Sequence, residues 1–357
     1  MNFKPFSQII GQDRAIEFLK RVIVRDRMPH AYLFTGIPGV GRTTTALALT
    51  QTLNCRQSMN GEGCGRCQSC RQIMNGHFVD LLSLHPDGQN IKIEQMRDLN
   101  HRLSFKPLSG NHRVSIIHQA EMMTLEAANS FLKTLEEPPP RNILILNVIE
   151  PLDLLPTIVS RCQRVPFNPL SVKLITEWLM NEKNVDEEKA LVVAKLSEGS
   201  LGRSIYLYES GFLEKRQDYL VRLIQLPEFS SEQILKLALE YSGKEKKKDG
   251  ALSIKDTIPF ELLSMWKTWY RDLIIMKVNG PADLLINVDF SNKLKKMSKN
   301  FIMENLIDSL LVIDRAQRGL MENRNLDLMM GKYSPNPEEA CYPIKIKGEK
   351  RWYGPNE

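Results

Sequence analysis

The hydrophobic residues in the first half of the chain follow two alternating patterns. In residues 12–25, Ile16, Leu19 and Ile23 recur at helical spacing. Continuous apolar runs occupy 31–35, 80–84, 113–117 and 142–148. Such runs are typical of strands in a parallel sheet that is covered on both faces. Because they alternate with helical segments, they predict a doubly wound α/β domain over residues 1–167.

After Pro166 the strand pattern ends and helical periodicity continues. We expect a small helical lid domain at 168–210, a helical collar domain at 211–332 and an irregular tail at 333–357. The last long helix is expected to present an apolar face to partner chains: Leu306, Leu310, Val312 and Ile313.

The stretch GIPGVGRT, which begins at Gly36, follows the first predicted strand and precedes a helical segment. It fits the phosphate-loop pattern G-x-x-x-x-G-K-[ST] at Gly36, Gly41 and Thr43. Gly39 also permits the turn in which backbone N–H groups point at phosphate oxygens. Thr43 would offer its hydroxyl to magnesium. The lysine position, however, holds Arg42, whose planar guanidinium does not reproduce a compact ammonium.

The strand RVSII is also followed by unexpected residues. Hydrolysis of a nucleotide needs a carboxylate at the end of this strand to hold magnesium. His118 and Gln119 stand where we would expect Asp-Glu, and Glu121 comes later. Together with Arg42, these residues predict that the chain does not hydrolyse ATP by itself. Two alternatives stay open: the loop binds a nucleotide without hydrolysing it, or it is retained only as the junction between a strand and a helix.

Four of the six cysteines are clustered, with C-x-x-C spacing. Such pairs present thiolates well to tetrahedral zinc. A structural zinc site in an insert at 55–70 is therefore predicted, with four ligands: Cys55, Cys64, Cys67 and Cys70. A ferredoxin-type cluster is the rival, but its fourth cysteine would follow soon after and precede a proline. His77 is a possible substitute ligand.

Composition limits the remaining classes of protein. Hydrophobic residues make up 42% of the chain and charged residues 25%, as in ordinary globular proteins. No apolar stretch reaches the roughly 18 residues of a membrane span, and the N-terminus lacks a signal-peptide layout. We expect a soluble, cytoplasmic protein. The net charge of +6 is mild for this length. The lysines of 244–248 either lie in a solvated loop or attract nucleic acid weakly.

Several stretches resemble the clamp-loader family of the AAA+ superfamily, and within it the delta-prime subunits of bacterial DNA polymerase III. They are FSQIIGQDRAIEFLKRVI, HAYLFTGIPGVGRTT, FLKTLEEPPP, LLPTIVSRCQ and LSEGSLGRSI. The resemblance covers about residues 1–330, and the tail at 333–357 lies beyond it. It implies an AAA+ domain, a helical lid and a helical collar.

The resemblance also implies function and partners. Gamma/tau and delta subunits, a sliding clamp and primed DNA would be the partners in a ring where gamma/tau hydrolyses ATP. Arg161 matches the S-R-C motif, whose arginine reaches a neighbour's ATP as an arginine finger. Val148 and Ile149 replace a sensing threonine, and Gly202 replaces the lid arginine of active subunits. The alternatives are an active gamma/tau-like ATPase and a metal-dependent regulator outside replication.

Overall fold

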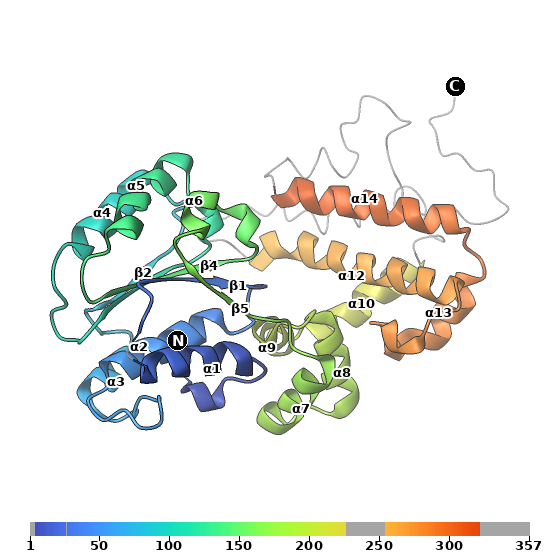
Figure 1. Ribbon diagram of the computed structural model, residues 1–357. Coiled ribbons are helices and arrows are strands. Elements are labelled where there is room, and N and C mark those ends of the chain that lie inside the picture. The colour runs from blue at the N-terminus through green and yellow to red at the C-terminus, as the bar shows by residue number, and fades with distance from the viewer. Residues whose placement is uncertain (1–3, 26, 226–253, 322–357) are drawn as a thin grey trace. The chain divides into compact units, whose positions relative to one another are not determined.

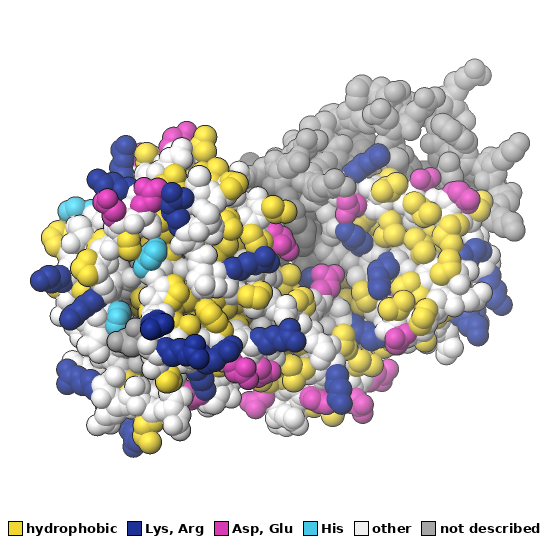
Figure 2. All heavy atoms as spheres, in the orientation of Figure 1, with side chains coloured by type: hydrophobic (Ala, Val, Ile, Leu, Met, Phe, Trp, Pro, Cys, Tyr) yellow, Lys and Arg dark blue, Asp and Glu magenta, His cyan; other side chains and the backbone are white. Residues whose placement is uncertain are grey.

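The computed structural model of the chain describes residues 4–25, 27–225 and 254–321 (Figure 1). The predicted tail at 333–357, the lysines of 244–248 and parts of the predicted collar lie outside these residues. On the face shown in Figure 2, basic, acidic and apolar side chains are interspersed. The distribution of charge on this face therefore does not indicate a functional region, and the candidate site is located from the sequence motifs instead.

The described residues form two compact units that interleave along the chain. The first unit runs to Asn184 and includes Ser197–Tyr206; the second comprises Val185–Leu196 and the described residues from Leu207 onward. The region predicted as helical at 168–210 contains three helices, but they are divided between the two units. The three-domain division itself stays a prediction.

Five parallel strands form the sheet of the first unit, in the order β2-β3-β4-β1-β5. They are β1 (Ala31–Thr35), β2 (Leu81–Leu84), β3 (Arg113–Ile117), β4 (Asn142–Val148) and β5 (Gln163–Pro166). All residues of β1, β3 and β4 are buried, which explains the continuous apolar runs in the sequence. The hydrophobic pattern does not predict β5, because Val165 is the one buried residue of that strand.

Helices cover both faces of this sheet (Figure 1). One face carries α1 (Asp13–Val24), α2 (Arg42–Asn54) and α3 (Gln68–Met74); the other carries α4 (Ile93–Leu103), α5 (Leu125–Glu136) and α6 (Pro156–Val159). The unit also contains α7 (Val172–Lys183) and the short turns η1 (Phe6–Gln8), η2 (Ala120–Met122) and η3 (Pro151–Asp153). Because β1 lies inside the sheet and leads directly into the glycine-rich loop, this is the expected α/β domain with a phosphate loop between strand and helix.

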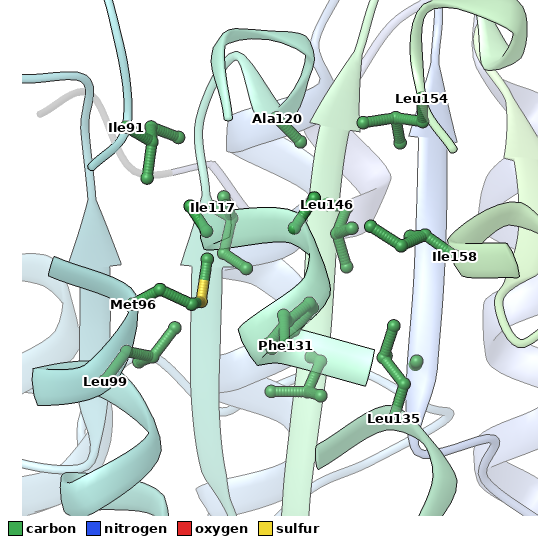
Figure 3. Close-up of a cluster of buried hydrophobic side chains, with 14 of the residues drawn as sticks. Ile91, Met96, Leu99, Ile117, Ala120, Phe131, Leu135, Leu146, Leu154 and Ile158 are labelled. Atoms are coloured by element: carbon green, nitrogen blue, oxygen red, sulfur yellow. The ribbon is translucent and has the colours of Figure 1, made fainter. Parts of the chain in front are cut away.

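A hydrophobic core holds α4, α5 and α6 against the sheet (Figure 3). Phe131 and Leu135 of α5 pack with Met96 of α4, Leu146 of β4 and Ile158 of α6, and all five are fully or almost fully buried. Each such side chain contributes about 1.5–3 kcal/mol relative to an exposed one. Helix α5 is therefore held rigidly along its length.

The second unit is helical, as predicted. Its helices are α8 (Glu187–Leu196), α10 (Phe212–Gln225), α12 (Ile254–Lys277), α13 (Ser291–Ser298) and α14 (Met303–Met321), with the turns η5 (Ala282–Leu284) and η6 (Val288–Phe290). Helix α9 (Leu201–Glu209) begins in the first unit and ends in the second. Helix α12 packs against α10, α13 and α14. Trp269 and Leu273 of α12 lie fully buried in the core that these helices share.

The expected partner-facing side of the last long helix needs a correction. Leu306 and Ile313 of α14 are buried within the second unit itself, and Leu310 packs partly against the same core. Among the residues of α14 whose burial the structure describes, up to residue 317, Ile307 and Leu311 are exposed large apolar side chains. The apolar positions were assigned to the wrong contact, because periodicity identifies a buried face but not what buries it.

Polar contacts tie α8 and α10 to the segment between α12 and α13. Arg216 of α10 donates to both carboxylate oxygens of Asp289, at 2.7 and 3.0 Å, and to Asn287 at 2.6 Å. Lys195 of α8 donates to the carbonyl oxygen of Asp283 at 2.9 Å. These contacts explain why α8 belongs to the second unit although α7 and most of α9 belong to the first.

Candidate functional site

The predicted phosphate loop connects β1 to α2. Gly36, Gly39 and Gly41 all have positive φ, at 141°, 75° and 112°. At Gly39 a side chain is also excluded by space, because a Cβ would meet the hydroxyl of Ser200 and lie 3.1 Å from the Cα of Gly202. The backbone path of a phosphate loop is thus present.

The carbonyl groups of this loop are bound by other parts of the chain. The carbonyl oxygens of residues 38–40 accept, in order, from the Ser200 hydroxyl at 2.8 Å, the Gly202 N–H at 2.9 Å and the Gln12 side-chain amide at 3.2 Å. Gln12 also bonds the backbone N–H and carbonyl oxygen of Asn168. The loop therefore keeps its path through contacts within its own unit.

The two side chains that follow the loop are directed to the end of β4. Arg42 donates a hydrogen bond from Nη1 to the carbonyl oxygen of Val148. Thr43 accepts from the side-chain amide of Asn147 at 3.3 Å. Burial lowers the pKa of Arg42, and the nearby Glu121 carboxyl opposes that shift. Arg42 is thus a cation used within the protein, at the position where a phosphate loop usually has its lysine.

The end of β3 carries no carboxylate directly after the strand. The ring of His118 stacks on that of His85, with centroids 4.1 Å apart and planes 7° from parallel. Burial, followed by the charges of His85 and Arg42, lowers the pKa of His118 to about 4, so its imidazole is neutral near pH 7. Burial raises the pKa of Glu121. A neutral imidazole therefore occupies the position where a magnesium ligand would be expected.

Arg161 lies at the surface just after α6. Its Nη2 donates to Glu136 Oε1 at 2.6 Å, and its Nη1 donates to the carbonyl oxygen of Thr157 at 2.9 Å. The side chain of Arg161 is 35% exposed. The next residue, Cys162, packs against the core, and burial raises its thiol pKa to about 12. The S-R-C stretch therefore has an anchored cysteine and an accessible arginine.

The four clustered cysteines converge at the C-terminal end of α2. Their Sγ atoms, from Cys55, Cys64, Cys67 and Cys70, all lie within 4.8 Å of one another. A tetrahedral zinc with bonds of about 2.3 Å needs sulfur atoms about 3.8 Å apart, and Cys64 Sγ and Cys70 Sγ are 4.0 Å apart. The residues present therefore fit a closed four-thiolate metal site.

Backbone N–H groups donate to two of these sulfur atoms and favour the anionic form of Cys64. The N–H of Cys64 donates to Cys55 Sγ at 3.2 Å, and the N–H of Cys67 donates to Cys64 Sγ at 3.3 Å. The N–H groups of Arg66 and Cys67 lower the pKa of Cys64 to about 6. The thiolate is the form that binds metal. His77 is not part of the cluster.

A family model described as "DNA polymerase III, delta subunit" matches residues 11–171. The match includes the phosphate loop, the cysteine insert and Arg161. Over these residues, the chain is similar to this family. The DNA polymerase III subunit delta′ of Bacillus subtilis is 29% identical over 327 residues, which cover 89% of this chain and 94% of that protein.

Tau subunits are similar as well. The DNA polymerase III subunit tau of Escherichia coli is 35% identical over 57% of this chain, and the tau subunit of B. subtilis is 26% identical over 88%. The chain spans 32% and 58% of the lengths of these two proteins. A solved Thermotoga maritima structure described as a gamma subunit-related protein covers 85% of this chain and 99% of its own, with 21% identity and a TM-score of 0.34.

Several residues of the site escaped the sequence analysis. Gln12 and Ser200 hold the loop from positions far from it in sequence. Asn147 belongs to a buried strand run, and nothing in its neighbourhood indicates a contact with Thr43. Glu136 lies in the FLKTLEEPPP stretch, one of those that carry the family resemblance, but no spacing rule relates it to Arg161. The signal that could have identified Glu136 is its place in a stretch that is specific to the clamp-loader resemblance.

Proposed function

We propose that the chain is a delta-prime-type clamp-loader subunit of DNA polymerase III that does not hydrolyse ATP itself. In this proposal Arg161 acts in trans on ATP bound by a gamma/tau neighbour. The partners are gamma/tau and delta subunits, the sliding clamp and primer-template DNA. The match of the family model to residues 11–171 and the similarity to the B. subtilis delta′ subunit over 89% of the chain support the assignment.

The residues at the end of β3 carry the argument against hydrolysis. Magnesium requires oxygen ligands, and phosphoryl transfer depends on a carboxylate that holds this ion close to the phosphates. Here the neutral ring of His118 follows the strand, and Gln119 has a left-handed φ of 49°. Arg42 is engaged with Val148 rather than free for a phosphate.

A gamma/tau-like ATPase is the second candidate. The 35% identity to the E. coli tau subunit over 209 residues favours it. The two candidates differ in one measurable property, which is ATP turnover by the purified chain alone. Robust magnesium-dependent hydrolysis would favour the gamma/tau-like candidate, whereas the absence of turnover supports the delta-prime-type candidate.

The cysteine cluster supports a structural role for zinc. Cys55, Cys64, Cys67 and Cys70 would all be ligands, which leaves no open coordination position for catalysis. The zinc would hold the insert at 55–70 in one conformation.

Location follows from the proposed role. None of the helices in the described residues is long and apolar enough to cross a bilayer. A subunit that acts on chromosomal DNA together with a bacterial polymerase would work in the cytoplasm.

Substitution of Arg161 tests the proposed role in trans. In a reconstituted complex, Arg161→Ala should lower DNA-stimulated ATPase activity and clamp loading, while ring assembly is kept. Arginine fingers contribute roughly 10³–10⁵ in rate at the site they serve; in a ring with several ATP sites the total loss is smaller. Arg164→Ala is the matched control, because Arg164 is a nearby exposed arginine. Equal activities of the two variants would refute the proposal.

A further inference from the structure

We propose that Glu136 is a positioning residue for Arg161. Its carboxylate holds the guanidinium at the protein surface in the orientation in which a phosphate from a neighbouring subunit meets it. This inference rests on the proposed function, in which Arg161 acts in trans, and it adds a second residue to that function.

The contacts of Arg161 engage one side of its guanidinium. Nη2 donates to Glu136 Oε1 at 2.6 Å, and Nη1 donates to the carbonyl oxygen of Thr157 at 2.9 Å and to Ser160 Oγ at 3.4 Å. A guanidinium has five N–H donors. These three bonds leave one N–H on Nη2 and the N–H on Nε for an external acceptor. The pair with Glu136 is therefore compatible with binding a phosphate.

Both partners of this ion pair are fixed to the same core. Glu136 ends α5, whose Phe131 and Leu135 are buried, and the carbonyl oxygen of Leu135 lies 3.0 Å from His30 Nε2. Arg161 follows α6, whose Ile158 is fully buried in the same core. The backbones of both residues are thus anchored, and the ion pair restricts the rotation of the Arg161 side chain.

The ion pair has little to do with folding. The side chains of Arg161 and Glu136 are 35% and 50% exposed, and exposed ion pairs contribute little to stability. The effect of the ion pair is to hold the side chain of Arg161 in one rotamer. A long side chain held in one rotamer loses less freedom when it contacts the reacting phosphate, which corresponds to roughly a two- to tenfold effect on rate.

The neighbouring carboxylate provides a matched control. Glu137 is also exposed, and in the part of the chain that the structure describes it forms no ion pair with Arg161. The experiment compares Glu136→Ala, Glu136→Gln and Glu137→Ala in the full complex with gamma/tau, delta, clamp and primed DNA. It measures kcat and KM of the DNA-stimulated ATPase, and the thermal unfolding of each variant.

Glu136→Ala should lower kcat roughly two- to tenfold and leave KM for ATP unchanged, because the guanidinium acts as charge develops on the transferred phosphoryl group. Glu136→Gln should lose less, since its amide oxygen still accepts a hydrogen bond. Glu137→Ala should match the unmodified complex. In an Arg161→Ala background, Glu136→Ala should cause no further loss.

The two proposals fail in different ways. If Arg161→Ala lowers the rate but Glu136→Ala behaves like Glu137→Ala, the positioning role is wrong and the role of Arg161 in trans stands. A faster rate in Glu136→Ala would equally overturn positioning, because the carboxylate would then be withholding the arginine. Unfolding of Glu136→Ala at a lower temperature than Glu137→Ala would indicate a structural role instead. If Arg161→Ala has no effect, the proposed function fails, and the positioning role fails with it.

Discussion

The two ends of helix α2 carry glycine-rich loops that differ in how complete their chemistry is. The N-terminal end has the backbone of a phosphate loop, but Arg42 bonds a carbonyl group and no carboxylate directly follows β3. At the C-terminal end, four thiol sulfurs converge within 4.8 Å, beginning with Cys55 directly after the helix. The backbone conformation of a loop therefore does not show whether its chemistry is retained. The side chains that surround the loop show this.

The loops also differ in what holds them. Three successive carbonyl groups of the phosphate loop are bound by Gln12, Ser200 and Gly202, so this loop needs no ligand to keep its shape. In the cysteine loop no residue from 56 to 66 is buried, and the ion pair of Lys20 and Glu62, at 2.7 Å, is one of its few anchors. We expect the cysteine loop to depend on a metal and the phosphate loop to be independent of a nucleotide.

Removal of the metal should have the largest effect. Structural zinc sites in peptides bind with about 10–16 kcal/mol, depending strongly on pH. Cys67→Ser or chelation should therefore release zinc and open residues 55–75 to proteases, while the sheet stays folded. Elemental analysis and limited proteolysis provide the measurement. A protein without zinc, or one with iron and a visible absorption band, would contradict the expectation.

A pair of glycine substitutions compares the two loops directly. Gly39 and Gly65 have nearly the same φ, +75° and +70°, but a Cβ at Gly65 would meet nothing within 4 Å. Left-handed backbone costs an alanine about 1–2 kcal/mol at either position. Gly39→Ala should cost about 1–3 kcal/mol more, because the Cβ also collides with residues 200 and 202. Urea unfolding measures this difference; equal losses would show that the contacts around Gly39 are loose.

The buried imidazole at the phosphate-loop end should make stability depend on pH. The pKa of His118 is lowered from 6.5 to about 4 in the folded protein, so the unfolded chain binds more protons between these values. Stability should therefore be full above about pH 7 and fall as the pH drops from 6.5 to 4. His118→Gln should flatten that part of the curve. Identical slopes of the urea midpoint against pH in both proteins would contradict this.

The smallest effect is expected from restoring carboxylates. His118→Asp combined with Gln119→Glu should leave the isolated chain without ATP turnover above background, because Arg42 still occupies the lysine position. A phosphate-release assay on the purified variant gives the answer. Clear magnesium-dependent turnover would mean that the loop retains more of its chemistry than the contacts of Arg42 suggest.

The sequence predicts the buried parts of the fold better than its polar contacts. The runs at 31–35, 113–117 and 142–148 are strands because their burial is continuous. The cysteine ligands could be predicted because C-x-x-C spacing acts over a few residues. The ion pair of Asp80 and Arg113, which are 0% and 5% exposed, joins residues from different elements, and no local pattern marks it.

The same limit explains the errors on single helix faces. Leu125, an apolar residue in the first turn of α5, is 61% exposed, whereas Phe131 of the same helix lies in the core. Helical periodicity alone does not show which of two neighbouring apolar faces of a helix is the buried one. The contact of Arg161 with Glu136 depends on how α5 and α6 meet, which is a property of tertiary packing.

The interleaving of the two units affects the order in which they can fold during synthesis. Domains generally fold as units while the chain is being made. All residues of the first unit are available once Tyr206 has left the ribosome. Helix α8 is made earlier, yet its buried residues, such as Val192 and Val193, belong to the second unit, whose other helices come later. The nascent chain therefore carries the apolar residues of α8 before the other helices of their unit have been made.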